Sequence, residues 1–385
     1  MRDSHCPICG SPSAPFLQFQ FGKKLDLPTA PEIRFCAADN FAYLTGAQQS
    51  AYDAYYRTVV NDYRHHGTAP AAVSPMILQK SHLLSALPGY FAERRHVLDY
   101  GCGEADLIMA LAREAPSSNF LGYDPSASVE TAAALAASSG LSNVGITGMA
   151  QSLEPRGYDL IIASHVFEHI VDFDAIATLG GWLADDGLLY VEVPDAVRYE
   201  VFARRPFLGY FDRIHVNHFS ARALVNLLAR YGFTYRGQLQ YAFAYPDGGE
   251  YPALGMLFGK GPAATGLRSP ALREPFQRYV GAEQARARQA GGALNGSGGV
   301  LVWGAGDNFY RSMTNGGPLS YADNIVLLDR RPQDIEINGK RLQSMNPEDG
   351  IRRLPYPVVV TVTESGRAIA EQIAKMDPAR KVVLI

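Results

Sequence analysis

The sequence predicts an α/β protein in which a parallel sheet is covered by helices on both faces, followed by a second, smaller α/β unit. Between residues 76 and 262, short apolar runs ending in Gly, Asp or Ser alternate with Ala- and Leu-rich stretches. This alternation is typical of βαβ units. A Gly-rich turn follows the first apolar run, and the same order of apolar run, Gly-rich turn and helical stretch returns after residue 300.

Each predicted strand of residues 76–262 is a short apolar run bounded by a turn residue. These runs are HVLDYG (96–101), NFLGYD (119–124), YDLIIAS (158–164) and GLLYVEVP (187–194). The stretch SASVETAAALAASSG (126–140) predicts an intervening helix, with Gly140 as its C-terminal cap.

Composition shifts divide the chain into four expected parts. Residues 1–75 form an N-terminal module with a helical lead-in, and residues 76–262 form the main α/β domain. Residues 263–299 are Gly- and Pro-rich at both ends, which predicts a linker that contains an exposed helix over 271–290 and a flexible spacer after it. Residues 300–385 form the second α/β unit.

Charge and hydropathy narrow the classes of function. The net charge of −3, without a long basic run, argues against a nucleic-acid-binding protein. No stretch approaches the roughly 18 apolar residues of a membrane span, and the first residues, MRDSHCPICG, lack an apolar signal-peptide core. We therefore expect a cytoplasmic protein without membrane or nucleic-acid partners, and its four cysteines are not expected to form a disulfide framework.

The turn after the first predicted strand, in VLDYGCGEADLIMALA, combines two glycines with nearby acidic residues. Gly101 and Gly103 stand between strand and helix, where the absence of a Cβ lets a ligand approach the backbone. Asp99 ends the strand, and Asp124 closes the next one, where a carboxylate can accept hydrogen bonds from ribose hydroxyls. The third glycine of the dinucleotide fingerprint is absent, because Asp106 occupies its position.

This turn resembles motif I of the class I S-adenosylmethionine (SAM)-dependent methyltransferases, in which an acid precedes GxGxG or GCG. YDLIIASHVFEHIVD resembles a later strand of that fold and the turn after it, and LADDGLLYVEVP resembles its strand entry, with Asp186 where proline is common. The resemblance covers residues 76–262 and implies a Rossmann-like fold. It implies that SAM is bound by Asp99, Gly101, Cys102, Gly103, Asp124, Ser164 and His165. Among these, Asp124 would hold the ribose, while Ser164 and His165 would touch SAM or the substrate.

The N-terminal CPICG resembles a zinc knuckle, since CxxC places two thiolates on one turn. Tetrahedral zinc needs two further ligands. Cys36 is one candidate beside Cys6 and Cys9, and Asp39 or His5 is the other. The alternative is a set of thiols that bind no metal.

A cysteine knuckle, a SAM domain and a second Rossmann-like unit together resemble the sugar C-methyltransferases of deoxysugar pathways. That family carries Tyr-His-Glu-His followed by Leu-Ser-Tyr-Phe-Ser. In RIHVNHFS, alignment through Phe219-Ser220 places the family's last His on His215 and its final Tyr on His218. The family's Tyr, His and Glu before that His become residues 212–214, Asp-Arg-Ile.

The two histidines have several possible roles. His215 suits a general base that removes a proton from a carbon next to a ketone, and His218 is a second catalytic candidate. The alternative is a structural role, in which the histidines only pack at the start of a helix that Ser220 caps. A metal site is not expected here, because the pair offers two ligands and no evident carboxylate partner.

We therefore expect a SAM-dependent methyltransferase of a small molecule, with C-methylation of a carbonyl-activated carbon on a nucleotide-linked keto-sugar as the specific hypothesis. The alternatives are an O- or N-methyltransferase of natural-product biosynthesis and a non-catalytic SAM- or nucleotide-binding module. The second Gly turn, WGAGDNFYRSM, either lines the substrate side or binds a nucleotide of its own, with Asp329 as the ribose acid.

Overall fold

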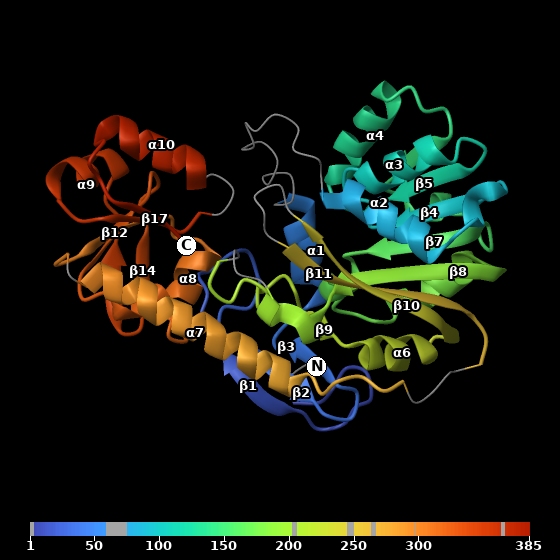
Figure 1. The fold of residues 1–385 in the computed structure, drawn as a ribbon, viewed down its shortest axis with the longest axis horizontal. Helices are drawn as coiled ribbons and strands as arrows, with labels where there is room; N and C mark the ends of the chain where they lie inside the picture. The colour runs from blue at the N-terminus through green and yellow to red at the C-terminus, as the bar shows by residue number, and fades with distance from the viewer. Residues whose placement is uncertain are drawn as a thin grey trace.

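The computed structural model describes residues 4–58, 75–201, 206–244, 250–262, 267–295, 297–362 and 366–385. Figure 1 shows a large sheet with its helices at one end of the molecule and a smaller sheet with α9 and α10 at the other. The N-terminal strands lie below and between them, beside the long helix α7. No helix within the described ranges is long and apolar enough to cross a membrane.

The large sheet carries the predicted strands but is mixed rather than wholly parallel. Its strands, in order across the sheet, are β10 (Phe233–Ala244), β11 (Glu250–Lys260), β8 (Leu183–Pro194), β7 (Tyr158–Ser164), β4 (His96–Tyr100), β5 (Asn119–Tyr123) and β6 (Val144–Thr147). The last five pair in parallel. β10 and β11 follow one another closely in the chain and pair antiparallel, and β11 is antiparallel to β8.

Helices cover both faces of this sheet, as expected. One apolar cluster contains residues of α2 (Pro75–Ala86), α3 (Asp106–Glu114) and α4 (Ser128–Ser138). The other contains residues of α5 (Ala175–Trp182) and α6 (Ala221–Ala229). Short helical turns connect these elements: η2 (Tyr90–Ala92), η3 (Ala150–Ser152), η4 (Phe167–His169) and η5 (Ala196–Val201).

The N-terminal part forms a small sheet that includes one strand of the main domain. Its antiparallel order is β1 (Ala14–Gln18), β2 (Glu32–Cys36), β3 (Phe41–Leu44) and β9 (Asn217–Phe219). Helix α1 (Gln49–Thr58) follows β3. Because β9 carries the second of the two histidines of interest, the N-terminal sheet fixes part of the site.

Residues 300–385 build a separate parallel sheet, which we call the C-terminal unit. Its order is β13 (Ile325–Leu328), β12 (Val300–Trp303), β16 (Val358–Val360) and β17 (Val382–Leu384). Its helices are α8 (Asp307–Met313), η6 (Pro318–Tyr321), α9 (Pro347–Arg353) and α10 (Gly366–Met376). A hairpin of β14 (Asp334–Ile337) and β15 (Lys340–Gln343) completes it.

The expected linker is largely one helix, α7 (Arg273–Asn295), which includes residues where the sequence suggested a flexible spacer. The helix is not merely exposed, because Phe276, Tyr279 and Leu294 are buried in the largest apolar cluster. It contacts η5 of the main domain and η6 of the C-terminal unit. Burial of these side chains outweighs the low helix propensity of Gly291 and Gly292.

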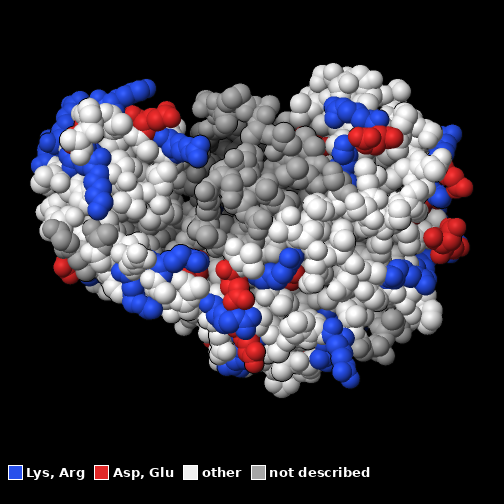
Figure 2. Space-filling model, in the orientation of Figure 1, with Lys and Arg blue, Asp and Glu red and all other residues white. Residues whose placement is uncertain are grey.

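Figure 2 shows basic and acidic side chains interspersed over the described part of the face seen in Figure 1.

Candidate functional site

The candidate site lies at the carboxyl ends of the parallel strands. β4 pairs with β5 on one side and with β7 on the other. The direction of the strand order therefore reverses at β4, and open α/β sheets bind ligands at such a reversal. The residues that the sequence assigned to SAM lie at the carboxyl ends of β4 and β7 and in the loops after β4, β5 and β7.

The glycine turn has the backbone that only glycine adopts readily. Gly101 has φ 78° and Gly103 has φ 54°. A Cβ on Gly101 would lie 2.5 Å from Cγ2 of Val166 in the loop after β7, whereas a Cβ on Gly103 would meet no atom within 4 Å. Gly101 therefore allows two loops to pack together, and Gly103 leaves its backbone open to a ligand. This cradle fits the group expected there, SAM.

The acidic residues of this edge are buried side by side. The Oδ2 atom of Asp124 accepts a hydrogen bond from the backbone N of Gly103 at 2.8 Å, and Oδ1 accepts one from Ser126 at 2.8 Å. Burial, and to a lesser extent the charge of Asp124, raises the pKa of Asp99 to about 7. Cys102 packs its sulfur over Gly122 of β5, since a Cβ there would lie 2.8 Å from that sulfur. Asp124 therefore has oxygens at the ligand edge, while Cys102 faces the sheet.

His165 lies between two buried glutamates. Its Nδ1 is 3.0 Å from Glu168 Oε1 and its Nε2 is 3.2 Å from Glu192 Oε1. Burial by itself lowers the pKa of His165, but the hydrogen bonds to both carboxylates outweigh burial and raise it to about 9. Burial raises the pKa of Glu168, whereas its pairing with His165 prevails and lowers it. One imidazolium between two carboxylates leaves the group with a net negative charge.

Glu192 is the residue that sequence reasoning missed. It is fully buried in β8, and its carboxylate accepts hydrogen bonds from Tyr190 at 2.6 Å, from Ser164 at 3.2 Å and from Tyr241. A glutamate inside the apolar run GLLYVEVP was the available signal, because an acidic residue is rarely buried without partners. Its partners come from β7, β8 and β10, which the sequence alone does not bring together.

His215 lies beside His169. The ring centroids of His169 and His215 are 4.9 Å apart, and one ligand atom each of Glu168, His169 and His215 lie within 4.8 Å of one another. His169 Nδ1 is 2.9 Å from the carbonyl oxygen of Ile214 and 2.7 Å from the hydroxyl of Tyr56. His215 is half-buried as a residue, and its Nδ1 atom is buried.

His218 is placed unlike a catalytic group. It is fully buried on β9, its ring packs edge-on against Phe211 and Phe276, and its Nδ1 is 3.1 Å from the hydroxyl of Tyr199. Burial lowers its pKa to about 3, so the imidazole is neutral. This packing argues against the catalytic role expected for His218, because the residue faces an aromatic core. Ser220 caps α6 as expected, accepting a hydrogen bond from Ala223 at 3.2 Å.

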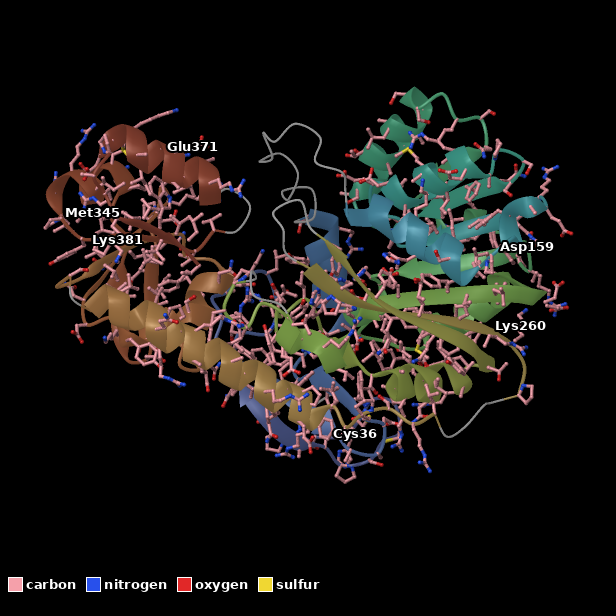
Figure 3. The ribbon with its side chains drawn as sticks, in the orientation of Figure 1. Cys36, Asp159, Lys260, Met345, Glu371 and Lys381 are labelled. Atoms are coloured by element: carbon pink, nitrogen blue, oxygen red, sulfur yellow. The ribbon has the colours of Figure 1, made fainter. Side chains whose placement is uncertain are left out.

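The structure brings together the residues of the expected zinc site. Ligand atoms of Cys6, Cys9, Cys36 and Asp39 all lie within 4.8 Å of one another. Cys6 Sγ lies 3.2 Å from Asp39 Oδ2, and Cys9 Sγ lies 3.7 Å from Cys36 Sγ. Burial raises the pKa of Cys6, so a thiolate there requires a nearby cation. Three sulfurs and one carboxylate oxygen fit tetrahedral zinc. Figure 3 labels Cys36 at this corner of the N-terminal sheet.

A second layer of contacts orients this cluster. Asn226 of α6 donates to Asp39 Oδ1 at 2.9 Å, and the backbone N of Asp39 lies 3.5 Å from Cys36 Sγ. Such outer contacts typically fix the ligands of metal sites. His5, the alternative fourth ligand, is exposed and lies outside the four-residue cluster.

The second Gly turn is used for packing between parts of the chain. Asp307, the first residue of α8, binds Arg213 through two contacts of 3.0 and 2.7 Å. Arg213 is almost fully buried and also donates to the carbonyl oxygen of Gly22 at 2.8 Å. The carboxylate at the start of this short helix is therefore engaged by a contact within the chain. Asp329 Oδ1 accepts a hydrogen bond from Arg331 in a local turn, and the expectation of a second nucleotide gains no support.

Comparison with known proteins identifies the main domain. A family model described as a methyltransferase domain matches residues 72–238. Similar solved structures include 1,6-didemethyltoxoflavin-N1-methyltransferase from Burkholderia thailandensis (18% identity, TM-score 0.41, 60% of this chain and 96% of that chain). Another is magnesium protoporphyrin IX methyltransferase from Synechocystis PCC 6803 (15% identity, TM-score 0.40, 55% and 99%). At such low scores these two likenesses carry no further conclusion. No curated protein matches the chain.

The matched residues include β4 to β8 and the glycine turn that forms the cofactor cradle. Residues 72–238 therefore match a methyltransferase domain, and the protein is a methyltransferase enzyme.

Proposed function

We propose that the enzyme methylates a carbon next to a carbonyl group, with His215 as the general base. The observation that carries this proposal is the position of a half-buried imidazole beside the cofactor edge. Val166 borders Gly101, Glu168 lies two residues further along the same loop, and a Glu168 oxygen lies within 4.8 Å of a His215 nitrogen. A short run of contacts therefore connects the base to the glycine turn.

In this reaction the protein removes a proton from the substrate and aligns the substrate carbon with the methyl group of SAM. SAM supplies an electrophilic methyl group when bound. His215 would take the proton from the carbon next to the ketone, the carbanion stabilised by the carbonyl would attack the methyl carbon, and sulfur would keep the electron pair of the broken C–S bond. The negative charge of the Glu168–His165–Glu192 group favours a sulfonium at this edge.

The substrate that we propose is a nucleotide-linked keto-sugar. The support is the resemblance of the three-part architecture to the sugar C-methyltransferases, together with the docking of the C-terminal unit onto the segment before His215. Asp212 and Arg213 stand where that family has Tyr and His, and both face α8, since Arg311 of α8 lies 3.5 Å from Asp212. We interpret the C-terminal unit as the substrate-side wall of the site.

We also propose that Cys6, Cys9, Cys36 and Asp39 bind one zinc ion. The support is the Cys3Asp donor set and its orientation by Asn226. Because these residues belong to the N-terminal module and not to the loops after β4, β5 and β7, zinc would stabilise that module and take no part in methyl transfer.

The first test combines ligand binding with a base variant. S-adenosylhomocysteine followed by dTDP or UDP should raise the unfolding temperature in two steps, because each ligand binds the folded state. On a panel of nucleotide-linked keto-sugars, His215→Gln should lower turnover by about 100-fold or more. His96→Gln, which changes an exposed histidine at the opposite edge of β4, is the matched control and should leave turnover unchanged.

Exchange of the substrate's α proton gives a second readout. With S-adenosylhomocysteine bound, the wild-type enzyme in D2O should exchange that proton, and His215→Gln should not. If turnover with any methyl acceptor survives His215→Gln within a few-fold, C-methylation by this base is wrong and the enzyme is an O- or N-methyltransferase.

A further inference from the structure

Glu168, His169 and His215 form a second group of metal-type ligands, separate from the cysteine cluster. Glu168 and His169 come from η4 and His215 from the loop before β9. One ligand atom of each lies within 4.8 Å of the others. Two imidazoles and one carboxylate form a donor set that divalent transition metals accept readily.

The hydrogen bonds of His169 set its tautomer for coordination. Its Nδ1 lies 2.9 Å from the carbonyl oxygen of Ile214. Because a carbonyl oxygen only accepts, this hydrogen bond requires the proton on Nδ1, which leaves the lone pair on Nε2. The Nε2 atom lies 4.0 Å from Glu168 Oε1, so the lone pair is on the side of the carboxylate. A ring N–H held by a backbone carbonyl is the usual outer support of a metal-bound histidine.

The carboxylate of Glu168 is the second observation that points to a cation. Its Oε1 pairs with His165, but its buried Oε2 has no hydrogen-bond partner among the described residues. A buried carboxylate oxygen without a partner costs free energy. His165 pairs with both Glu168 and Glu192, so one imidazolium faces two carboxylates. The remaining negative charge would attract a cation beside Glu168.

We propose that Glu168, His169 and His215 bind a divalent transition-metal ion, of the class of Zn²⁺, Co²⁺ or Fe²⁺. Ligand atoms around such an ion lie about 2.0–2.2 Å from it, so the three side chains draw closer by about 1–2 Å on binding. Coordination would use the same His215 lone pair that accepts the proton in catalysis, so a bound metal ion and catalysis exclude each other. This exclusion rests on the proposed function, whereas metal binding at the three residues is independent of it.

Cobalt is the probe, because its spectrum reports its ligands. Full-length protein saturated with Zn²⁺ at the cysteine cluster is titrated with Co²⁺, and any cobalt at cysteine is recognised by its thiolate charge-transfer band. We expect one further equivalent with weak visible bands and no such charge transfer. His169→Gln should weaken this binding by about tenfold or more, and the exposed His96→Gln should leave it unchanged.

Circular dichroism and thermal unfolding verify that His169→Gln is folded, and Glu168→Gln serves as a second ligand variant. If no cobalt binds without thiolate bands, or if both variants bind it as tightly as wild type, the proposal is wrong. If cobalt fails to bind while His215→Gln still abolishes turnover, the metal site is wrong and the base assignment stands. Cobalt that binds without reducing turnover supports the metal site and contradicts the base assignment.

Discussion

At the scale of single residues, the cofactor edge depends on two glycines that serve different purposes. Gly101 and Gly103 both have positive φ, which costs other residues about 1–2 kcal/mol. Only Gly101 lacks space for a side chain, because Val166 lies against it. Gly103 has room, and that room is where the ligand would approach.

Alanine at these two positions should therefore separate folding from binding. We expect Gly101→Ala to lower the free energy of unfolding by more than Gly103→Ala, since it adds a 2.5 Å contact with Val166 to the backbone strain. We expect Gly103→Ala to lose about 1–2 kcal/mol of stability and to weaken S-adenosylhomocysteine binding. Urea unfolding and calorimetric titration measure the two effects. Equal losses of stability would contradict the assigned role of Gly101.

His218 should make stability depend on pH. Its pKa is about 3 in the folded protein and near 6.5 in an unfolded chain. Between these values the unfolded state binds more protons, so stability falls as pH drops below about 6.5, by about 2 kcal/mol at pH 5. His218→Gln should lose less stability than wild type over this range, and His96→Gln should match wild type. Parallel pH profiles for wild type and His218→Gln would contradict this.

Residue-level predictions from sequence succeeded where the signal was local. The glycine turn and the CxxC knuckle could be recognised in the sequence because their residues are neighbours in the chain. The structure places Cys36 and Asp39 beside Cys6 and Cys9. The His165–Glu192 contact could not be predicted from the sequence, because His165 lies in the loop after β7 and Glu192 lies 27 residues further along, in β8. The spacing of His215 and His218 suggested a pair, but burial of β9 against β3 separates their environments.

At the scale of elements, α8 connects to the loop that carries His215. Asp307 of α8 binds Arg213 bidentately, Tyr52 of α1 donates to the carbonyl oxygen of Arg213 at 2.5 Å, and the backbone N of His215 donates to Asp212 at 3.1 Å. The loop is therefore fixed from both α1 and α8.

Removal of Asp307 should destabilise the protein because it leaves a buried guanidinium without its partner. The side chain of Arg213 is 2% exposed and that of Asp307 is 21% exposed, so we expect Asp307→Asn to cost about 3 kcal/mol. Asp334→Asn is the matched control in the same unit, since the Asp334–Arg341 pair is largely exposed and should contribute less than about 1 kcal/mol. Chemical unfolding of both variants measures the difference, and similar small losses would contradict the buried pair.

The sequence predicted most elements of the main sheet because buried parallel strands are continuous apolar runs. It missed the edge strand β10, since the polar residues of β10, such as Arg236 and Gln238, obscure its pattern. It also missed the full length of α7, whose late glycines suggested a spacer while tertiary packing of Leu294 kept the helix. Both misses are cases in which contacts distant in sequence outweigh local propensity.

At the scale of the whole molecule, the parts interlock around the site. β9 of the main domain completes the N-terminal sheet, and α7 contacts both the main domain and the C-terminal unit. In Figure 1, α7 runs from the N-terminal strands to the C-terminal unit. The apolar cluster that includes Phe19, Tyr199, Phe276 and Val302 draws on all of these parts, so we expect them to unfold together.

Removal of zinc should therefore destabilise more than the N-terminal module. A chelator should lower the unfolding temperature of the wild-type protein, because metal bound to the folded state raises its stability. Cys9→Ser should lower the starting temperature and abolish the response to chelator, and elemental analysis should find less zinc. A zinc content of zero in wild-type protein would contradict the site.

The central claim is that SAM binds at the carboxyl ends of β4 and β5, with Asp124 holding it. Calorimetric titration of S-adenosylhomocysteine into wild type and Asp124→Ala tests it most directly. Asp159→Ala is the matched control, since Asp159 also accepts a backbone hydrogen bond, from His96 at 2.8 Å, but at the amino end of β4, where Figure 3 labels it. We expect binding in wild type and Asp159→Ala, and a loss of about 1.4 kcal/mol or more, tenfold in affinity, in Asp124→Ala. Equal affinity in all three proteins would contradict the account.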